Sequence, residues 1–316
     1  METATLATVA IVAEIGLAPV ARVEVRISMQ TRRIRFTTAA IAIAVAAMLI
    51  NGSSHAARVG VLSNNHANEA ATDFSAKVTG HTFTAVNVSA AVPTLATLTA
   101  NFDVLLLFED STFANATPVG NVVAAYANAG RAVVLGTFYD QDRSDVATVV
   151  TPNGWGALES IDPNTTDGVG TSYVPRSLDP ASIVAHPLTA GVTTLTAGQW
   201  AGGNQAKPGT IVVANWLQKN ARGNPDPAIA YRITGPACVI HVAIAPDYPI
   251  GGVPGTDFGG DFYRVWRNAF DFGAAACSTG PTPDPFAIPS HSPASLALTA
   301  LLLLLFGGFS RRLTRR

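Results

Sequence analysis

Short apolar runs separated by polar loops divide the middle of this chain into alternating strands and helices. The segments 58–63 (RVGVLS), 102–108 (FDVLLLF) and 132–136 are almost wholly apolar, which is typical of strands in a parallel sheet that is covered on both faces. Between them, residues 69–78 and the segment after Thr117 carry apolar residues at helical spacing. This alternation predicts an α/β fold with a doubly wound, mostly parallel sheet.

Local signals mark the ends of the clearest predicted helix. Thr117 is a favourable N-cap, Pro118 suits the first turn, and Gly130 is a typical C-terminal stop. Further strands are predicted at 82–88, 210–216, 228–232 and 237–245, and a closing helix at 261–272 with Tyr263, Trp266 and Phe270 on one face.

Charge is sparse and unevenly placed along the 316 residues, which are enough for one large domain or two small ones. Charged residues make up only 13% of the chain. Between Ala57 and Gly280 there are 3 Lys and 8 Arg against 17 acidic residues, so the body is acidic and the basic residues gather at the two ends. An acidic body without a basic patch argues against nucleic-acid binding.

The N-terminal part contains a segment with the form of a secretory signal peptide. From Met29, an Arg-rich stretch leads into the apolar run 37–50 and then into small residues that end at Ala56. This pattern predicts export and cleavage by signal peptidase between Ala56 and Ala57. Residues 1–28 fit no targeting pattern, so we expect them to be an upstream artefact; a long leader or a signal anchor is the alternative.

The C-terminal part combines a linker, an apolar run and a basic cluster. Residues 278–293 are rich in Pro, Ser and Thr and have the composition of a linker. Residues 294–309 are mostly apolar and would span about 24 Å as a transmembrane helix. The cluster at 310–316 would stay in the cytoplasm, leaving the body outside; its basic residues are Arg311, Arg312, Arg315 and Arg316.

This C-terminal arrangement resembles the sorting tails of the PEP-CTERM class. Ile288 and Pro289 match the first two residues of the variant that begins Ile-Pro-Thr-Leu, whereas Ser290 and His291 replace Thr-Leu, and the usual Trp before the helix is missing. The resemblance implies a Gram-negative exporter, a place at its outer surface or envelope, and an exosortase-type membrane protease that removes the tail near Pro289. A plain membrane anchor is the alternative.

The two cysteines, Cys238 and Cys277, belong to no CxxC motif or Cys/His cluster. A zinc site is therefore not expected, and the sequence indicates no other metal or cofactor. An even number of cysteines in an exported protein predicts one disulfide, with two buried free thiols as the alternative.

The body, residues 57–277, resembles the flavodoxin-like fold of class I glutamine amidotransferases, in particular the ThuA-like branch, over about 200 residues. The stretches that carry the resemblance are DVLLLFEDSTFANATPVGNVVAAYANAGRAVVLGTF at 103–138, AHPLTAGV at 185–192 and CVIHVAIAPDYP at 238–249.

The catalytic residues of that family are not found at the matching positions. The family has a nucleophilic Cys on a tight turn after a central strand and a His after a later strand. Here the turn reads Gly-Thr-Phe-Tyr at 136–139, and the later strand ends at Pro246 and Asp247. His241 lies inside that strand, where a core role is usual. The resemblance therefore implies the fold without its hydrolytic machinery.

Several polar residues are expected at one edge of the sheet, because ligands of open α/β sheets bind beyond the carboxyl ends of the strands. Acidic groups near a histidine could act as an acid–base pair or bind a cation or a sugar; solvated loop residues and helix caps are the plain alternative. The catalytic candidates are Glu109, Asp110, Asp140 and His66, and the ligand-binding candidates are Asn65, His66, Asp110, Tyr139 and Asp142.

Aromatic residues give a second hint of function. Trp155, Trp200 and Trp216 flank Gly-rich loops, where exposed rings could stack on sugars, although such residues often cap the core. His186, followed by Pro187, is expected to hold a turn.

Together these features predict an exported, non-catalytic surface domain that binds a carbohydrate or another envelope component. The rival hypothesis is a carbohydrate-related hydrolase that uses Glu109, Asp110 and Asp140. A purely structural surface protein is the third. An exposed Trp at the carboxyl edge of the sheet would favour the binding module.

Overall fold

The structure, a computed structural model, describes residues 56–89, 91–108, 113, 115–145, 154–169 and 174–276. No helix among these residues is both long and apolar enough to cross a membrane. Several predictions lie outside the described residues: most of the signal peptide, Glu109, Asp110, Cys277, the linker with Ile288 and Pro289, the transmembrane helix and the Arg cluster.

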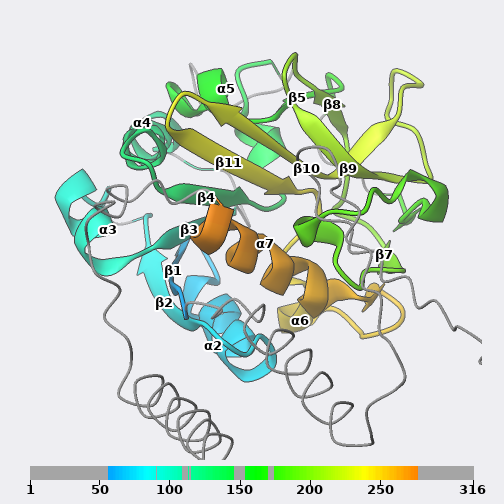
Figure 1. Ribbon diagram of the computed structural model, residues 1–316, viewed down its shortest axis with the longest axis horizontal. Helices are drawn as coiled ribbons and strands as arrows, with labels where there is room; N and C mark the ends of the chain where they lie inside the picture. Colours follow the sequence, from blue (N-terminus) through cyan, green and yellow to red (C-terminus); the bar gives the residue numbers. More distant parts are fainter. Residues whose placement is uncertain are drawn as a thin grey trace, which may run out of the picture. The chain divides into compact units, whose positions relative to one another are not determined.

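The predicted parallel sheet is present and has seven strands in the order β2-β1-β3-β4-β11-β10-β9 (Figure 1). Its first five strands are parallel, and their order is that of flavodoxin-like folds. The two remaining strands continue the sheet in antiparallel fashion. The parallel strands are β1 (Arg58–Ser63), β2 (Thr82–Asn87), β3 (Val104–Leu107), β4 (Ala132–Leu135) and β11 (Ala237–Val242); the antiparallel ones are β10 (Asp226–Thr234) and β9 (Ile211–Trp216).

Helices cover both faces of this sheet, which explains why its central strands are continuously apolar. On one face lie α2 (Ala67–Lys77) and α7 (Phe262–Ala276), whose aromatic residues Phe74, Trp266 and Phe270 pack together. The other face is covered by α3 (Leu95–Asn101), α4 (Ala116–Asn128) and the short α5 (Leu158–Ile161).

Alternation along each strand decides which helices its side chains meet. In β3, Val104 and Leu106 face α2 and α7, whereas Leu105 and Leu107 face α3 and α4. The same rule turns His241 of β11 away from the α7 face, since Ile240 and Val242 belong to that face. The register of β11 therefore places the His241 side chain on the face of the sheet opposite to α7.

Two small sheets and several short helices complete the body around the central sheet (Figure 1). The first pairs β5 (Asn164–Thr166) with β8 (Asn204–Ala206), and the second orders β12 (Phe258–Gly260), β7 (Leu195–Ala197) and β6 (Arg176–Ser177). Single-turn helices occur at α6 (Tyr248–Gly251), η2 (Pro180–Ser182) and η3 (Pro187–Thr189), and η1 (Tyr139–Asp142) follows β4.

Most predicted elements agree with the structure to within a few residues, but the N-cap of α4 was assigned wrongly. The helix begins at Ala116 after the N-cap Asn115, two residues earlier than predicted. The hydroxyl of Thr117 donates to the carbonyl of Gly154 instead of capping the helix. Gly130, with a φ of 79°, follows the helix as predicted. His186 accepts a hydrogen bond from Leu188 N and begins η3, in line with its predicted turn.

Close packing of α4 makes a substitution of Gly120 a test of the fold. A Cβ at this position would overlap the carbonyl oxygen of Trp155. Gly→Ala inside a helix normally stabilises by about 0.5–1 kcal/mol. Here we expect Gly120→Ala to lower the free energy of unfolding by about 1–3 kcal/mol, because α4 must shift. Urea unfolding followed by circular dichroism measures it.

The control for this test is Gly251→Ala in α6, where nothing lies within 4 Å of the added Cβ. We expect that variant to stay within about 0.5 kcal/mol of the unmodified protein. A stabilised Gly120→Ala variant would contradict the packing of α4 against the 154–156 turn.

Candidate functional site

The candidate site is the carboxyl edge of the sheet, where β1, β3, β4 and β11 end. Asn65 and His66 follow β1 directly, as predicted. His66 precedes α2 with a left-handed φ of 55°, and its Nδ1 lies 3.8 Å from Oε1 of Glu69. Two of the predicted candidates at this edge, Glu109 and Asp110, lie outside the described residues.

Tyr139 and Asp140, which follow β4, lie inside the protein. The Tyr139 hydroxyl donates a 2.7 Å hydrogen bond to Oδ2 of Asp162, and its ring stacks on Trp155. Asp140 is fully buried, and the pKa of its carboxyl is raised well above the usual range by burial. Neither residue lies at the solvent-facing edge, where Tyr139 was predicted to contact a ligand and Asp140 to act in catalysis. Of the third candidate in this turn, Asp142, only the backbone is described.

Asp140 faces a second buried titratable group, His241. Its Oδ2 lies 3.6 Å from Nε2 of the imidazole, and the other ring nitrogen lies 2.8 Å from the side-chain nitrogen of Asn164. Burial lowers the pKa of His241 to about 3, so the ring is neutral at pH 7. The sequence singled out Asp140 as a catalytic candidate and assigned His241 to a core role. Their proximity and the contact with Asn164 were missed, because the three residues lie far apart in sequence.

A dense ionic cluster surrounds this pair on the side of α5. The carboxylate of Asp162, which is fully buried, accepts hydrogen bonds from Tyr139, Arg143 and Lys207. Arg143 also binds Asp145 at 2.9 Å. The acidic segment 140–145 therefore contributes Arg143 and Asp145 to an internal network.

A buried ion pair holds the loop that leads from β7 to β8. Arg176 and Asp226 are 2.9 Å apart and almost wholly buried. Arg176 also donates to the carbonyl of Ala201, and the backbone N–H groups of Gly203 and Asn204 donate to Asp226. Burial raises the pKa of Asp226 to about 6, and Arg176 opposes that shift. The backbone of this loop is thus held by the side chains of Arg176 in β6 and Asp226 in β10.

This loop carries Trp200, which lies at the carboxyl edge. Its ring centroid is 5.8 Å from that of Phe138, just after β4, and 5.4 Å from that of Tyr248, just after β11. Trp200 is half-buried, whereas Trp155 and Trp216, the other two candidates, belong to the core. Trp200 also has a left-handed φ of 55°, a conformation that is rare for a bulky residue.

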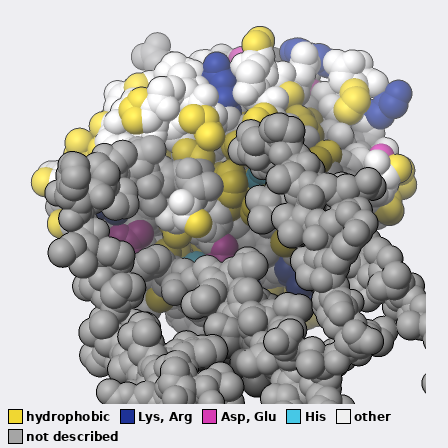
Figure 2. Space-filling view, viewed as in Figure 1, with side chains coloured by type: hydrophobic (Ala, Val, Ile, Leu, Met, Phe, Trp, Pro, Cys, Tyr) yellow, Lys and Arg dark blue, Asp and Glu magenta, His cyan; other side chains and the backbone are white. Residues whose placement is uncertain are grey.

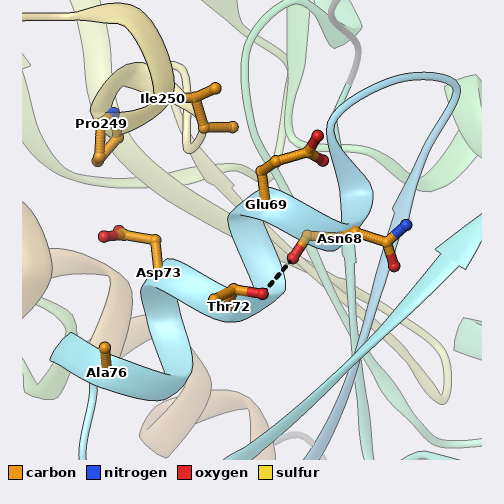
Figure 3. A pocket seen from close by; sticks show the side chains of 7 residues that line it. All are labelled: Asn68, Glu69, Thr72, Asp73, Ala76, Pro249 and Ile250. Carbon is orange, nitrogen blue, oxygen red and sulfur yellow. Dashed lines mark hydrogen bonds between the residues drawn. The ribbon is translucent and has the colours of Figure 1, made fainter.

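Beside these aromatics, an open hollow of about 590 Å³ lies between α2 and α6. Figure 3 shows Glu69 and Asp73 projecting from α2 on the side that faces Pro249 and Ile250. The hydroxyl of Tyr263 donates to Asp73, and burial raises the pKa of that carboxyl. The full lining is Asn68, Glu69, Thr72, Asp73, Ala76, Pro249 and Ile250, which offers amide, carboxylate, hydroxyl and apolar groups together.

On the face seen in Figure 2, the described side chains that are visible are mostly hydrophobic or uncharged, with few Lys, Arg, Asp or Glu side chains among them.

The turn that the sequence resemblance matches to the nucleophile turn of amidotransferases lies between β4 and η1. It contains Thr137, whose hydroxyl is buried and has no hydrogen-bond partner among the described residues. A hydroxyl nucleophile requires an adjacent base, and the structure places none within hydrogen-bonding distance there. Elsewhere, Cys238 is buried and disulfide-bonded; its predicted partner Cys277 lies outside the described residues, so the pairing stays a prediction.

Comparison with known proteins adds a likeness of architecture. No protein-family model and no curated protein matches the chain. Among solved structures, a protein from Parabacteroides merdae ATCC 43184 that is described as ThuA-like is 11% identical with a TM-score of 0.48, over 72% of this chain and 94% of that one. Agd3, a carbohydrate deacetylase, is 14% identical with a TM-score of 0.38, over 70% of this chain and 33% of that one.

These likenesses leave the function open. The first neighbour bears the name of the branch that the sequence resembles. With TM-scores below 0.5, neither likeness assigns an activity to this chain, and this chain matches only a third of the deacetylase.

The ion pair under the Trp200 loop yields a prediction on stability. Arg176→Met leaves the carboxylate of Asp226 buried without its cation, so we expect a loss of about 3–5 kcal/mol in the free energy of unfolding. The double variant Arg176→Met/Asp226→Leu should recover part of that loss, since no charge remains buried. Urea unfolding of the three proteins measures both effects.

The matched control is Arg58→Met, which breaks an ion pair of the same length, 2.9 Å, whose side chains are 49% and 30% exposed. Solvent screening limits its expected cost to under about 1 kcal/mol. Equal losses at the two sites would show that burial of the Arg176 pair contributes nothing.

Proposed function

We propose that this protein is an exported, non-catalytic surface domain that binds a carbohydrate at the carboxyl edge of its sheet, with Trp200 as the stacking surface. The observation that carries the proposal is the position of Trp200. It is half-buried at the edge where open α/β sheets bind ligands, and it packs against Phe138 and Tyr248.

The ring of Trp200 is suited to a sugar because its position is fixed and its face is broad. Aromatic rings present a large rigid surface to the C–H groups of a sugar at little entropic cost. The loop beneath it is held by the Arg176–Asp226 pair, so the ring does not have to be ordered when a ligand binds. Its left-handed backbone is the kind of strain that clusters at binding sites.

The neighbouring hollow supplies the polar groups that a sugar requires. The carboxylates of Glu69 and Asp73 can accept hydrogen bonds from hydroxyls, and the amide of Asn68 can both donate and accept. Tyr248, which touches Trp200, directly precedes Pro249 and Ile250 in the wall of the hollow (Figure 3). A ligand that stacks on Trp200 would therefore have hydrogen-bonding groups within reach.

The buried state of Asp140 argues against the rival hydrolase. A general acid or base must lie within hydrogen-bonding reach of the proton that it transfers. Asp140 has no exposed surface, and it lies beside His241 instead of in the hollow. The family's Cys is replaced by Thr137 in the turn after β4.

Binding is tested with the full chain on an array of neutral and acidic oligosaccharides, followed by titration of the best glycan against intrinsic fluorescence. We expect Trp200→Ala to weaken binding at least about tenfold, which corresponds to about 1.4 kcal/mol. Trp200→Phe should retain part of the affinity because a ring remains.

Leu217→Ala is the matched control, since Leu217 is a large hydrophobic residue that is 61% exposed in a different loop. Its affinity should equal that of the unmodified chain. Binding of a glycan that survives loss of the Trp200 ring would contradict this site, and an array without any binder would contradict a carbohydrate ligand.

Export and sorting are proposed from the two ends of the sequence. The mass of the mature protein recovered from cells should correspond to a chain that starts at Ala57 and stops near Pro289. That result would support signal peptidase and an exosortase-type protease as processing partners. A mass that runs through Arg316 would favour a plain anchor over a sorting tail.

A further inference from the structure

Lys207, which directly follows β8, is a buried amine in contact with a carboxyl group. Its Nζ atom donates to Oδ1 of Asp162, the residue that ends α5, and to the backbone carbonyl of Glu159. The Asp162 side chain has no exposed surface, and that of Lys207 is only 12% exposed. Lysine is rarely buried to this extent. The two groups therefore meet in a place from which most water is excluded.

The two oxygens of the Asp162 carboxyl group have different surroundings. Oδ2 accepts hydrogen bonds from the Tyr139 hydroxyl, at 2.7 Å, and from the guanidinium of Arg143. Oδ1 faces the amine of Lys207 instead. Two donors aimed at one oxygen stabilise negative charge on it, as in an oxyanion hole. Oδ2 is thus suited to remain as a carbonyl oxygen, and Oδ1 to carry a proton and leave.

Burial favours the neutral forms of both partners. It raises the pKa of the Asp162 carboxyl against the opposing effect of Arg143 and Lys207. It also lowers the pKa of the Lys207 amine against the attraction of Asp162. Transfer of one proton from the ammonium to the carboxylate gives an amine beside a carboxylic acid. A desolvated, neutral lysine is a nucleophile.

The charge of Arg143 does not depend on Asp162 alone. Its guanidinium lies 2.9 Å from Oδ1 of Asp145 and 3.7 Å from Oε2 of Glu159. These two carboxylates still balance the arginine when Asp162 is uncharged. Arg143 can therefore donate to Oδ2 in both states of the Asp162 carboxyl group.

From these contacts we infer that Lys207 and Asp162 condense to form an intramolecular isopeptide bond. The lone pair of Nζ attacks Cγ of the protonated Asp162, and a C–N bond forms. One amine proton passes to Oδ1, the bond between Cγ and Oδ1 breaks, and this oxygen leaves as water. A neutral secondary amide remains, and its carbonyl oxygen, Oδ2, keeps the hydrogen bonds from Tyr139 and Arg143.

The fold supplies the conditions that this condensation requires. The backbone N–H of Lys207 donates to the carbonyl of Pro163 at 2.9 Å, so the main chain holds the two reacting residues side by side. Such positioning replaces a bimolecular encounter by an intramolecular one. Exclusion of water also slows the reverse reaction, hydrolysis of the amide. The balance needs no oxidant, metal or further reactant, because water is the only product that leaves.

The bond would join α5 to the end of β8 and close a loop between positions that are 45 residues apart. This loop contains Trp200. A covalent link of that kind restricts the unfolded chain in the way that a disulfide does, but reductants do not break it. The inference is independent of the carbohydrate site, since neither reacting group belongs to that site.

The test is the intact mass of the full chain, measured after unfolding and after reduction of the disulfide. We expect the unmodified protein to weigh one water molecule less than the sequence between its observed termini. Lys207→Arg keeps the positive charge but has no primary amine, so it should show its full mass. Lys219→Arg, the same change at an exposed lysine, should retain the loss of water.

Digestion with trypsin locates the bond. Cleavage after Arg176 separates the two reacting residues into the peptides 144–176 and 177–219. A cross-linked fragment then has two N-termini, Ser144 and Ser177, whereas a fragment left uncut at Arg176 has one. N-terminal sequencing of the fragment distinguishes the two.

Because mass is measured on the unfolded chain, the result for the unmodified protein does not depend on whether the variants fold. A full mass for the unmodified protein would overturn the inference, and so would a loss of water that persists in Lys207→Arg. Lys207 and Asp162 would then form an ion pair only.

Discussion

The need to cover a parallel sheet on both faces governs the whole arrangement of this protein. The four central parallel strands, β1, β3, β4 and β11, are buried on both sides and must lie between two layers of helices. The faces are thereby closed to ligands, and polar side chains are left to the ends of the strands. The candidate functional residues, from His66 to Trp200, therefore lie in loops beyond those ends or just beneath them.

Beneath the carboxyl edge, buried ion pairs hold together segments that elsewhere in the protein are held by apolar packing. The pairs Arg176–Asp226 and Arg143–Asp162 join short, irregular segments to the sheet at points where regular secondary structure is scarce. Buried ion pairs of this kind are only a modest source of stability, but they fix orientation because each partner strongly requires the other. Their role here is to give the β5–β8 region and the loop before it one defined position.

Much of the fold could be predicted from the sequence, and the reason is local. The strand 104–107 is indicated by a run of apolar residues, and the helix 116–128 by apolar residues at helical spacing; both signals lie within about fifteen residues. The site could not be predicted to the same extent, since it is assembled by pairs that are distant in sequence. Asp140 and His241 are about a hundred residues apart, and Asn164 meets His241 across 77 positions.

Burial was equally hard to infer from sequence. Tyr139 and Trp200 both follow short polar or Gly-containing stretches, yet Tyr139 is internal and Trp200 reaches the surface. One signal pointed to Trp200: Gly202 and Gly203, both with positive φ, follow it closely and mark a loop that bends sharply beside a ring. No local pattern marked the ion pairs that hold this loop.

The left-handed backbone of Trp200 has an implication for how this chain balances stability against use. A residue with a Cβ gives up about 1–2 kcal/mol in that conformation. A chain optimised for folding alone would carry glycine there, as it does two and three residues later. With Trp at position 200, the folded backbone is therefore more strained than it would be with glycine there.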